Sequence, residues 1–94
     1  MNNAAAKGRR NEHRSMRLFE EEGYRCIRSA ASKGEWDFVA ISVSDVALVQ
    51  VKTGRWPGSD EMAAMRAFPC PKGWRKEIHR WLPRRRQPEV RRIK

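Results

Sequence analysis

Three polar side chains stand in a stretch of sequence that is otherwise typical of buried strands. Asp37, Gln50 and Lys52 lie within residues 36–53, where β-branched and aromatic residues dominate. Burying such groups without partners is costly, so we expect them to pair or to bind a metal. A carboxylate, an amide oxygen and the main-chain carbonyl of Val51 are hard oxygen ligands of the kind that Mg²⁺ or Mn²⁺ takes. The stretch therefore predicts a divalent metal site.

The same groups suit the hydrolysis of a phosphodiester bond. A divalent ion activates a bound water as the nucleophile. Lys52 is expected to orient that water or to stabilise charge in the transition state, acting as a base or as an electrostatic partner. A simple salt bridge between Asp37 and Lys52 across a hairpin is the structural alternative, and it would carry no chemistry.

Two strands must bring these side chains together. The composition predicts strands at 36–43 and 46–53, with the turn signal Ser44-Asp45 between them. If the turn has an even number of residues, the numbers of paired residues add up to 87. A turn of odd length would change this register and separate the candidate residues.

The predicted register places the polar side chains on one face. Gln50 and Lys52 are two residues apart and therefore share a face of their strand. Asp37 would lie directly opposite Gln50. Val49 and Val51 would face the core from the other side.

Glu12 is expected to add a second carboxylate from the preceding helix, predicted at 8–22. On a helix, Glu12 lies on the same side as Met16 and Phe19, which should face the sheet. It could then bind the metal directly or through a water. The alternative is an ordinary surface glutamate.

The remaining pattern predicts a single domain, residues 1–94, of the α/β (α+β) class with a mixed central sheet. Within it, residues 1–7 are expected to form a mobile arm or the frayed start of a helix, 8–53 the catalytic core, and 54–94 a helix followed by basic strands. Gly23 should end the first helix. The other predicted elements are a strand at 24–28, a loop at 29–35, a helix capped by Ser59 or Asp60 and ending at Ala67, and strands at 74–82 and 89–93.

Charge points to a nucleic-acid partner. The 94 residues carry 21 Lys and Arg against 11 Asp and Glu, a formal charge of +10. Residues 72–94 alone hold ten basic and two acidic side chains. A cationic end with nearby aromatic residues favours contact with a phosphate backbone over a merely solvated surface. A small RNA-binding domain, in which Asp37 and Lys52 are structural, is a further alternative.

Other candidate groups carry less information. Cys26 and Cys70 form no metal-binding pair and are expected to be reduced packing residues. His79, alone on a basic strand, is expected at the surface. The sequence contains no signal peptide and no transmembrane run, so an intracellular, cytoplasmic protein is expected, as for a phage or mobile-element enzyme.

These motifs, in this order, resemble the PD-(D/E)XK nuclease superfamily. The resemblance spans about residues 8–53 and includes Gly8-x-x-x-Glu12, Gly23-Tyr24, Arg28-Ser29, Ser32-x-Gly34-x-x-Asp37 and Gln50-Val51-Lys52. The chain is most similar to archaeal-type Holliday junction resolvases and their small phage-type relatives. The resemblance implies that Glu12 is the family's helix glutamate, Asp37 its metal ligand and Lys52 its catalytic lysine. Ser32 matches a loop serine that lies near the site.

One departure concerns Gln50, because the family usually has Glu or Asp there. Gln occurs in some branches, including the virus-type replication–repair nucleases, which act on flaps or single strands. The change removes one negative charge from the metal site, so an inactive binding protein of the same fold is an alternative to an active nuclease.

The resemblance also implies a homodimer that nicks a four-way DNA junction symmetrically. Apolar residues available for an interface are Trp56, Met62, Met65, Phe68, Trp74 and Trp81, although each could instead fill a core. The side chains expected to contact DNA are Arg9, Arg10, Arg28, Ser32, Lys33, Arg75, Arg80, Arg84, Arg85 and Arg86.

Overall fold

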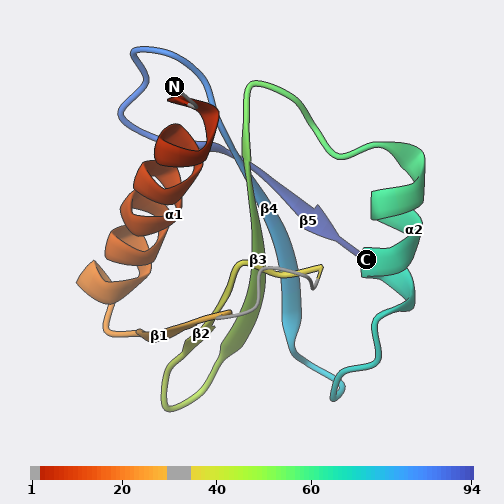
Figure 1. Ribbon diagram of the computed structural model, residues 1–94. Coiled ribbons are helices and arrows are strands. Elements are labelled where there is room, and N and C mark those ends of the chain that lie inside the picture. Colours follow the sequence, from red (N-terminus) through yellow and green to blue (C-terminus); the bar gives the residue numbers. More distant parts are fainter. Residues whose placement is uncertain (1–2, 30–34) are drawn as a thin grey trace.

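The chain folds into two helices and a five-stranded mixed sheet, as the computed structural model in Figure 1 shows. The structure describes residues 3–29 and 35–94. The predicted α+β class is thereby confirmed. No helix within these described ranges is long and apolar enough to cross a membrane. The elements are α1 (Asn3–Glu21), β1 (Arg25–Arg28), β2 (Phe38–Ile41), β3 (Val46–Thr53), α2 (Ser59–Ala67), β4 (Arg75–Trp81) and β5 (Glu89–Ile93).

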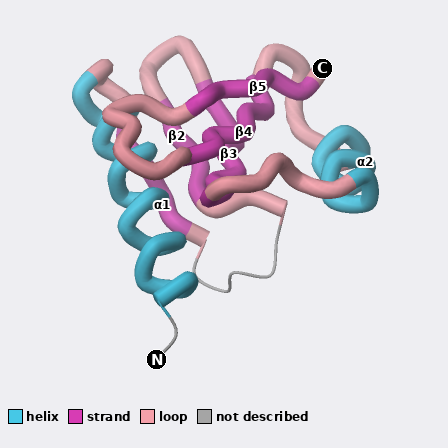
Figure 2. The backbone as a smooth tube through the Cα atoms, turned by 90° about the horizontal axis from the view of Figure 1, so that it is seen from above, coloured by secondary structure: helices cyan, strands magenta, loops and turns pink. Residues whose placement is uncertain are grey.

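The strands lie in their sequence order, β1-β2-β3-β4-β5. Every neighbouring pair is antiparallel except β3 and β4, which are parallel and are joined through α2. A parallel pair needs such a crossover because its strands start at the same end of the sheet. Helix α1 covers one face of the sheet and α2 the other (Figures 1 and 2).

Each helix packs on its own apolar cluster, and alternate residues of β3 serve the two clusters. Under α1, Met16 and Phe19 are buried against Val49 and its neighbours on β2. Under α2, Met65 is buried with Leu48 and the apolar residues of β4 and β5. The two-residue period of a strand explains this division, because successive side chains point to opposite faces.

The β2–β3 hairpin has the predicted register. Phe38 pairs with Val49 and Ile41 with Val46, so the numbers of paired residues add up to 87. The turn is an even one of four residues, closed by the Ser42 amide donating to the Asp45 carbonyl at 2.8 Å. Val49 and Val51 of β3 pack in a core cluster, as predicted, and the structure shows that this cluster is the one under α1.

Several element boundaries differ from the predictions, and β2, predicted at 36–43, spans only Phe38–Ile41. Helix α1 begins at Asn3 and not near Gly8, so residues 3–7 form the start of the helix, the second of the two predicted alternatives. Alanines at positions 4–6 have the highest helix propensity and extend the helix. Helix α2 is capped by Gly58, without a side-chain cap, and not by Ser59 or Asp60.

The predicted end of α1 is confirmed. Gly23 adopts a φ of 94°, and the next amide, from Tyr24, donates to the Phe19 carbonyl at 3.1 Å. The left-handed conformation is easy only for glycine, so this residue turns the chain from α1 directly into β1.

Candidate active site

Asp37 lies just before β2 and is bonded to β3 through both its backbone and its side chain. Its amide donates to the Val49 carbonyl at 2.8 Å, and its Oδ2 accepts from the Val51 amide at 2.6 Å. The carboxylate thus takes the place of a backbone carbonyl at the end of the ladder. This double contact fixes the side chain at the edge of β3.

The environment of Asp37 disfavours its negative charge. Burial raises the pKa of this carboxyl above its ordinary value, and the Val51 hydrogen bond only partly opposes the rise. The negative charge of Glu12 raises the pKa of Asp37 further, whereas Lys52 and Arg28 lower it. Because the ionised form of this carboxyl is disfavoured, a nearby cation would stabilise it.

Glu12 extends from α1 toward the same edge. Its side chain is only 18% exposed, and its Oε1 accepts from Arg28 Nε of β1 at 3.0 Å. The predicted orientation toward the sheet is therefore found in the structure. Arg28, which is expected to contact DNA, pairs with Glu12 in the structure.

The backbone of β3 adds a carbonyl on the Asp37 side. The amide and carbonyl of one strand residue point to the same side of the strand. Since the Val51 amide points at Asp37, the Val51 carbonyl faces that side as well. The neighbouring Gln50 is partly buried on β3, where it pairs with Ile78 of β4.

Lys52 forms its ion pair with a residue that the sequence did not indicate. Its Nζ lies 2.7 Å from Oε2 of Glu61, in the first turn of α2. The lysine does not form a hairpin salt bridge with Asp37, although its charge still lowers the pKa of that carboxyl. Glu61 lies outside the part of the chain where motifs were evident, so the sequence did not identify it as the partner of Lys52.

The charge of the cluster is low for a metal site. Residues 3–29 and 35–94 contain no group of three or more His, Cys, Asp or Glu side chains that could hold a metal ion. The candidate ligands are thus two carboxylates, Asp37 and Glu12, and two neutral oxygens, those of the Gln50 side chain and the Val51 carbonyl. This is the expected consequence of Gln50 in place of an acid.

The sequence of this region matches a known family. The model of the archaeal Holliday junction resolvase (Hjc) family matches residues 3–57, more than half of the chain and all four candidate residues. The chain belongs to the Hjc family. It is a Holliday junction resolvase-like nuclease, and the prediction from its motifs is confirmed.

The Hjc fold is also found by structure. The chain is similar to the solved structure of Hjc from Archaeoglobus fulgidus, described as a Holliday junction resolvase from an archaeal hyperthermophile. The two are 23% identical with a TM-score of 0.70, and the match covers 93% of this chain and 71% of the other. No curated protein matches the chain.

The residues expected to contact DNA have different surroundings in this Hjc-family chain. Arg9, Arg10 and the basic run 84–86 are exposed, as a phosphate-binding surface requires. Arg80 is paired with Glu89. Ser32 and Lys33 lie outside the described residues.

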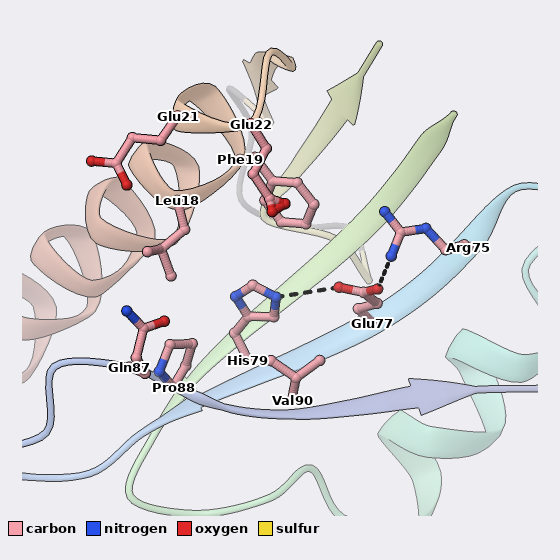
Figure 3. Close-up of a pocket in the computed structure, with 10 residues that line it drawn as sticks. All are labelled: Leu18, Phe19, Glu21, Glu22, Arg75, Glu77, His79, Gln87, Pro88 and Val90. Atoms are coloured by element: carbon pink, nitrogen blue, oxygen red, sulfur yellow. Dashed lines mark hydrogen bonds and ion pairs between the residues drawn. The ribbon is translucent and has the colours of Figure 1, made fainter. Parts of the chain in front are cut away.

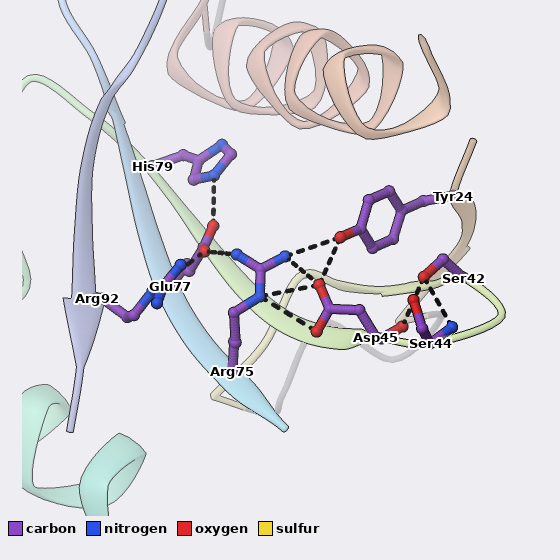
Figure 4. A network of polar contacts seen from close by, with 8 residues as sticks. All are labelled: Tyr24, Ser42, Ser44, Asp45, Arg75, Glu77, His79 and Arg92. Carbon is purple, nitrogen blue, oxygen red and sulfur yellow. Dashed lines mark hydrogen bonds and ion pairs between the residues drawn. The ribbon is translucent and has the colours of Figure 1, made fainter. Parts of the chain in front are cut away.

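Arg75 does not belong to such a surface. Its guanidinium binds the Asp45 carboxylate, with Nη2 2.6 Å from Oδ2, and also contacts Glu77 and the Tyr24 hydroxyl (Figure 4). Its charge is therefore used inside the chain to join β4 to the hairpin turn. We correct its predicted role from DNA contact to structural ion pair.

The prediction that His79 lies at the surface is wrong. It is buried, only 4% exposed, and stacks on Phe19. Its Nδ1 lies 3.0 Å from the hydroxyl of Ser15 on α1, and its Nε2 lies 3.4 Å from Glu77. Polar side chains on β4 thus face α1 and pair with one another, so the strand is not a surface strand.

A pocket of about 330 Å³ lies beside this polar group, between the end of α1 and strands β4 and β5 (Figure 3). Glu77 and His79 line it, together with Glu21 and Glu22 of α1. None of the candidate metal ligands lines it. The pocket is therefore separate from the nuclease site.

Proposed function

We propose that this chain is a divalent-metal-dependent endodeoxyribonuclease that cleaves four-way DNA junctions, with Asp37, Glu12, Gln50 and Lys52 as its active site. The observation that carries the proposal is the Asp37 carboxylate, fixed on the Val51 amide beside Glu12 in a chain of the Hjc family. A buried carboxylate with a raised pKa, next to a second one, is a site that a cation would stabilise.

The residues present fit Mg²⁺ or Mn²⁺. Asp37 and the Val51 carbonyl would hold the ion, with Gln50 as a neutral ligand and Glu12 acting directly or through water. When bound, the ion lowers the pKa of a coordinated water and neutralises charge on the scissile phosphate. Asp37 needs no rearrangement for this, because its backbone and side chain are already bonded to β3.

Lys52 and Arg28 supply the positive charge of the proposed site. The Lys52 ammonium would stabilise the negative charge that develops on the phosphate oxygens. Arg28 holds Glu12 in this structure and would be available for a phosphate if the ion displaced it. Both residues act from fixed strands, which limits the reorganisation needed during the reaction.

A basic surface beside α1 would hold the DNA backbone. Arg14 of α1 donates to the Arg85 carbonyl at 2.7 Å, and its guanidinium stacks on the Trp81 ring at 3.9 Å. These contacts bring the basic run 84–86 next to the helix that carries Arg9 and Arg10. Such contacts bind phosphates without reading base sequence, as a structure-selective nuclease requires.

We further propose that the active form is a homodimer, because symmetric cleavage of a four-way junction needs two sites related by a two-fold axis. Met65 and Trp81, suggested above as interface residues, are instead buried in the core of the chain. Trp74 and Val90 remain exposed and are available for an interface.

A panel of labelled substrates tests the proposed activity. Four-way junctions, flaps, single strands and linear duplexes would be incubated with the protein in Mg²⁺, Mn²⁺ or EDTA. We expect paired, symmetric nicks in the junction that require a divalent ion. Preferential cutting of flaps or single strands would favour a replication–repair nuclease. Binding of the junction without cleavage in any ion would favour a DNA-binding protein of the same fold.

Gln50 gives that last alternative a specific test. Restoring the acid, Gln50→Glu, adds a charged ligand beside Asp37 and should lower the metal concentration for half-maximal cleavage by about 10-fold. Metal titrations of junction cleavage by the two proteins would measure this shift. The control is Gln87→Glu, which makes the same change in the exposed loop before β5 and should not alter the titration. If Gln50→Glu cleaves and the wild type does not, the chain is a DNA-binding protein that has lost its activity.

A further inference from the structure

Helix α2 brings an additional acidic residue to the proposed active site. The family match ends at residue 57, and α2 begins directly after it at Ser59. From the first turn of this helix, Glu61 Oε2 reaches Lys52 Nζ at 2.7 Å. The lysine is 27% exposed and the glutamate 51%, so the pair lies at the rim of the site and not in the core.

Both oxygens of this carboxylate have partners. While Oε2 holds Lys52, Oε1 accepts from the amide of Gly58, the cap of α2, at 3.3 Å. The two contacts fix the carboxylate between the helix terminus and the end of β3. The Lys52 hydrogen bond, with help from the Gly58 amide, holds the pKa of Glu61 below its usual range despite some burial.

The position of α2 does not depend on this pair. Met65, only 1% exposed, anchors the helix in the core. At the other end of α2, Lys76 Nζ of β4 donates to the carbonyls of Met65, Arg66 and Phe68 at 2.8–3.0 Å. Glu61 is thus presented to Lys52 by a helix that is fixed independently.

We propose that Glu61 is a positioning residue for the nuclease reaction, holding the Lys52 ammonium at the end of β3 where the scissile phosphate would lie. The inference rests on the proposed role of Lys52. A lysine side chain has four rotatable bonds and samples many rotamers when it is unpaired. A fixed carboxylate restricts that freedom and keeps the ammonium close to Asp37, whose pKa its charge already lowers.

The reaction rate under single-turnover conditions tests this role. With four-way junction DNA and the full chain, Glu61→Gln should slow cleavage by about 10-fold, because the lysine loses its fixed partner. The junction dissociation constant should stay unchanged, and the melting temperature should fall only slightly, because the Lys52–Glu61 pair lies at the surface. The matched control is Asp60→Asn, which removes the same charge from the same helical turn and should cleave at the wild-type rate. In the part of the chain that the structure describes, Asp60 has no ion pair.

Two further variants separate the possible failures. If Glu61 acts through Lys52, Lys52→Ala and the double variant Lys52→Ala/Glu61→Gln should be equally slow. Wild-type cleavage by Glu61→Gln would overturn the inference, as would a loss of junction binding, or unfolding at the assay temperature, that accounts for the slower rate. Wild-type cleavage by Lys52→Ala would instead refute the proposed active site.

Discussion

Asp37→Asn is expected to reduce junction cleavage by about 10³-fold or more, equivalent to roughly 4 kcal/mol of transition-state stabilisation. The change removes the charge that would hold the divalent ion. It keeps an oxygen that can accept the Val51 amide, so the end of the β2–β3 ladder should remain intact. Single-turnover cleavage and junction binding would be measured side by side, and only cleavage should fall.

Although Asp37→Asn should lose cleavage, we do not expect it to lose stability. Because the pKa of Asp37 is raised in the folded chain, its ionised form destabilises the fold above that pKa. At neutral pH the asparagine variant should therefore melt at the same temperature as the wild type or higher. A lower melting temperature would identify Asp37 as a structural residue.

Asp45→Asn is the matched control on the same hairpin. Its carboxylate accepts hydrogen bonds from Arg75 and from Tyr24. These two bonds, that of Arg75 most strongly, hold the pKa of Asp45 below its usual range. A lowered pKa means that the ionised form stabilises the fold. The control should therefore lower the melting temperature while the folded protein still cleaves. The two carboxylates are thus expected to respond in opposite ways.

Arg75→Ala should destabilise the chain by about 2–3 kcal/mol, because it leaves the Asp45 and Glu77 carboxylates without their shared guanidinium. For a chain of this size that is a large part of the total stability. Urea unfolding at pH 7 would measure it. Arg85→Ala, at an exposed loop position, should instead weaken junction binding without a change in unfolding.

The pH dependence of stability provides an independent check on Arg75. Burial alone would raise the pKa of Glu77, but contacts with His79 and Arg75 outweigh it and lower the pKa, as also occurs at Asp45. The ionised Asp45 and Glu77 carboxylates stabilise the fold fully above the ordinary carboxyl pKa of about 4. This stabilisation is lost as the pH falls through the lower pKa values that the two groups have in the folded chain. The wild type should lose stability in this acidic range, and Arg75→Ala should lose less. Equal losses would contradict the structural role of Arg75.

Local patterns in the sequence were sufficient for the hairpin and for the orientation of Glu12. The bounds of β3 and β5 are those predicted from residue composition, and the even turn at 42–45 set the register. The helical spacing from Glu12 to Phe19 correctly placed that carboxylate toward the sheet. Each of these features depends on residues close together in the chain, where side-chain periodicity is a direct guide.

Contacts between distant segments could not be predicted in this way. Arg75 and Asp45 are 30 positions apart, and His79 and Ser15 are 64 apart. The sequence around a charged or polar residue on a basic strand does not indicate which residue of another element it will contact. The same applies to Glu61, whose relation to Lys52 depends on how α2 crosses from β3 to β4. The hydrogen bond from the buried Asn11 to the exposed Thr53, at 2.9 Å, is a further example.

The parallel pairing of β3 and β4 has a consequence for the order of folding. Phe38 and Val49 of the hairpin are 11 positions apart, whereas Ala47 and Arg75 of the parallel pair are 28 apart. Closing the longer loop loses more chain entropy, and hairpins form within about 1–10 μs. The proposed metal-binding edge at Asp37 and Val51 is therefore expected early in folding, and Lys52 acquires its acidic partner, Glu61, only when the crossover through α2 closes. Substitutions in the hairpin should accordingly slow folding, and those in the crossover should mainly speed unfolding.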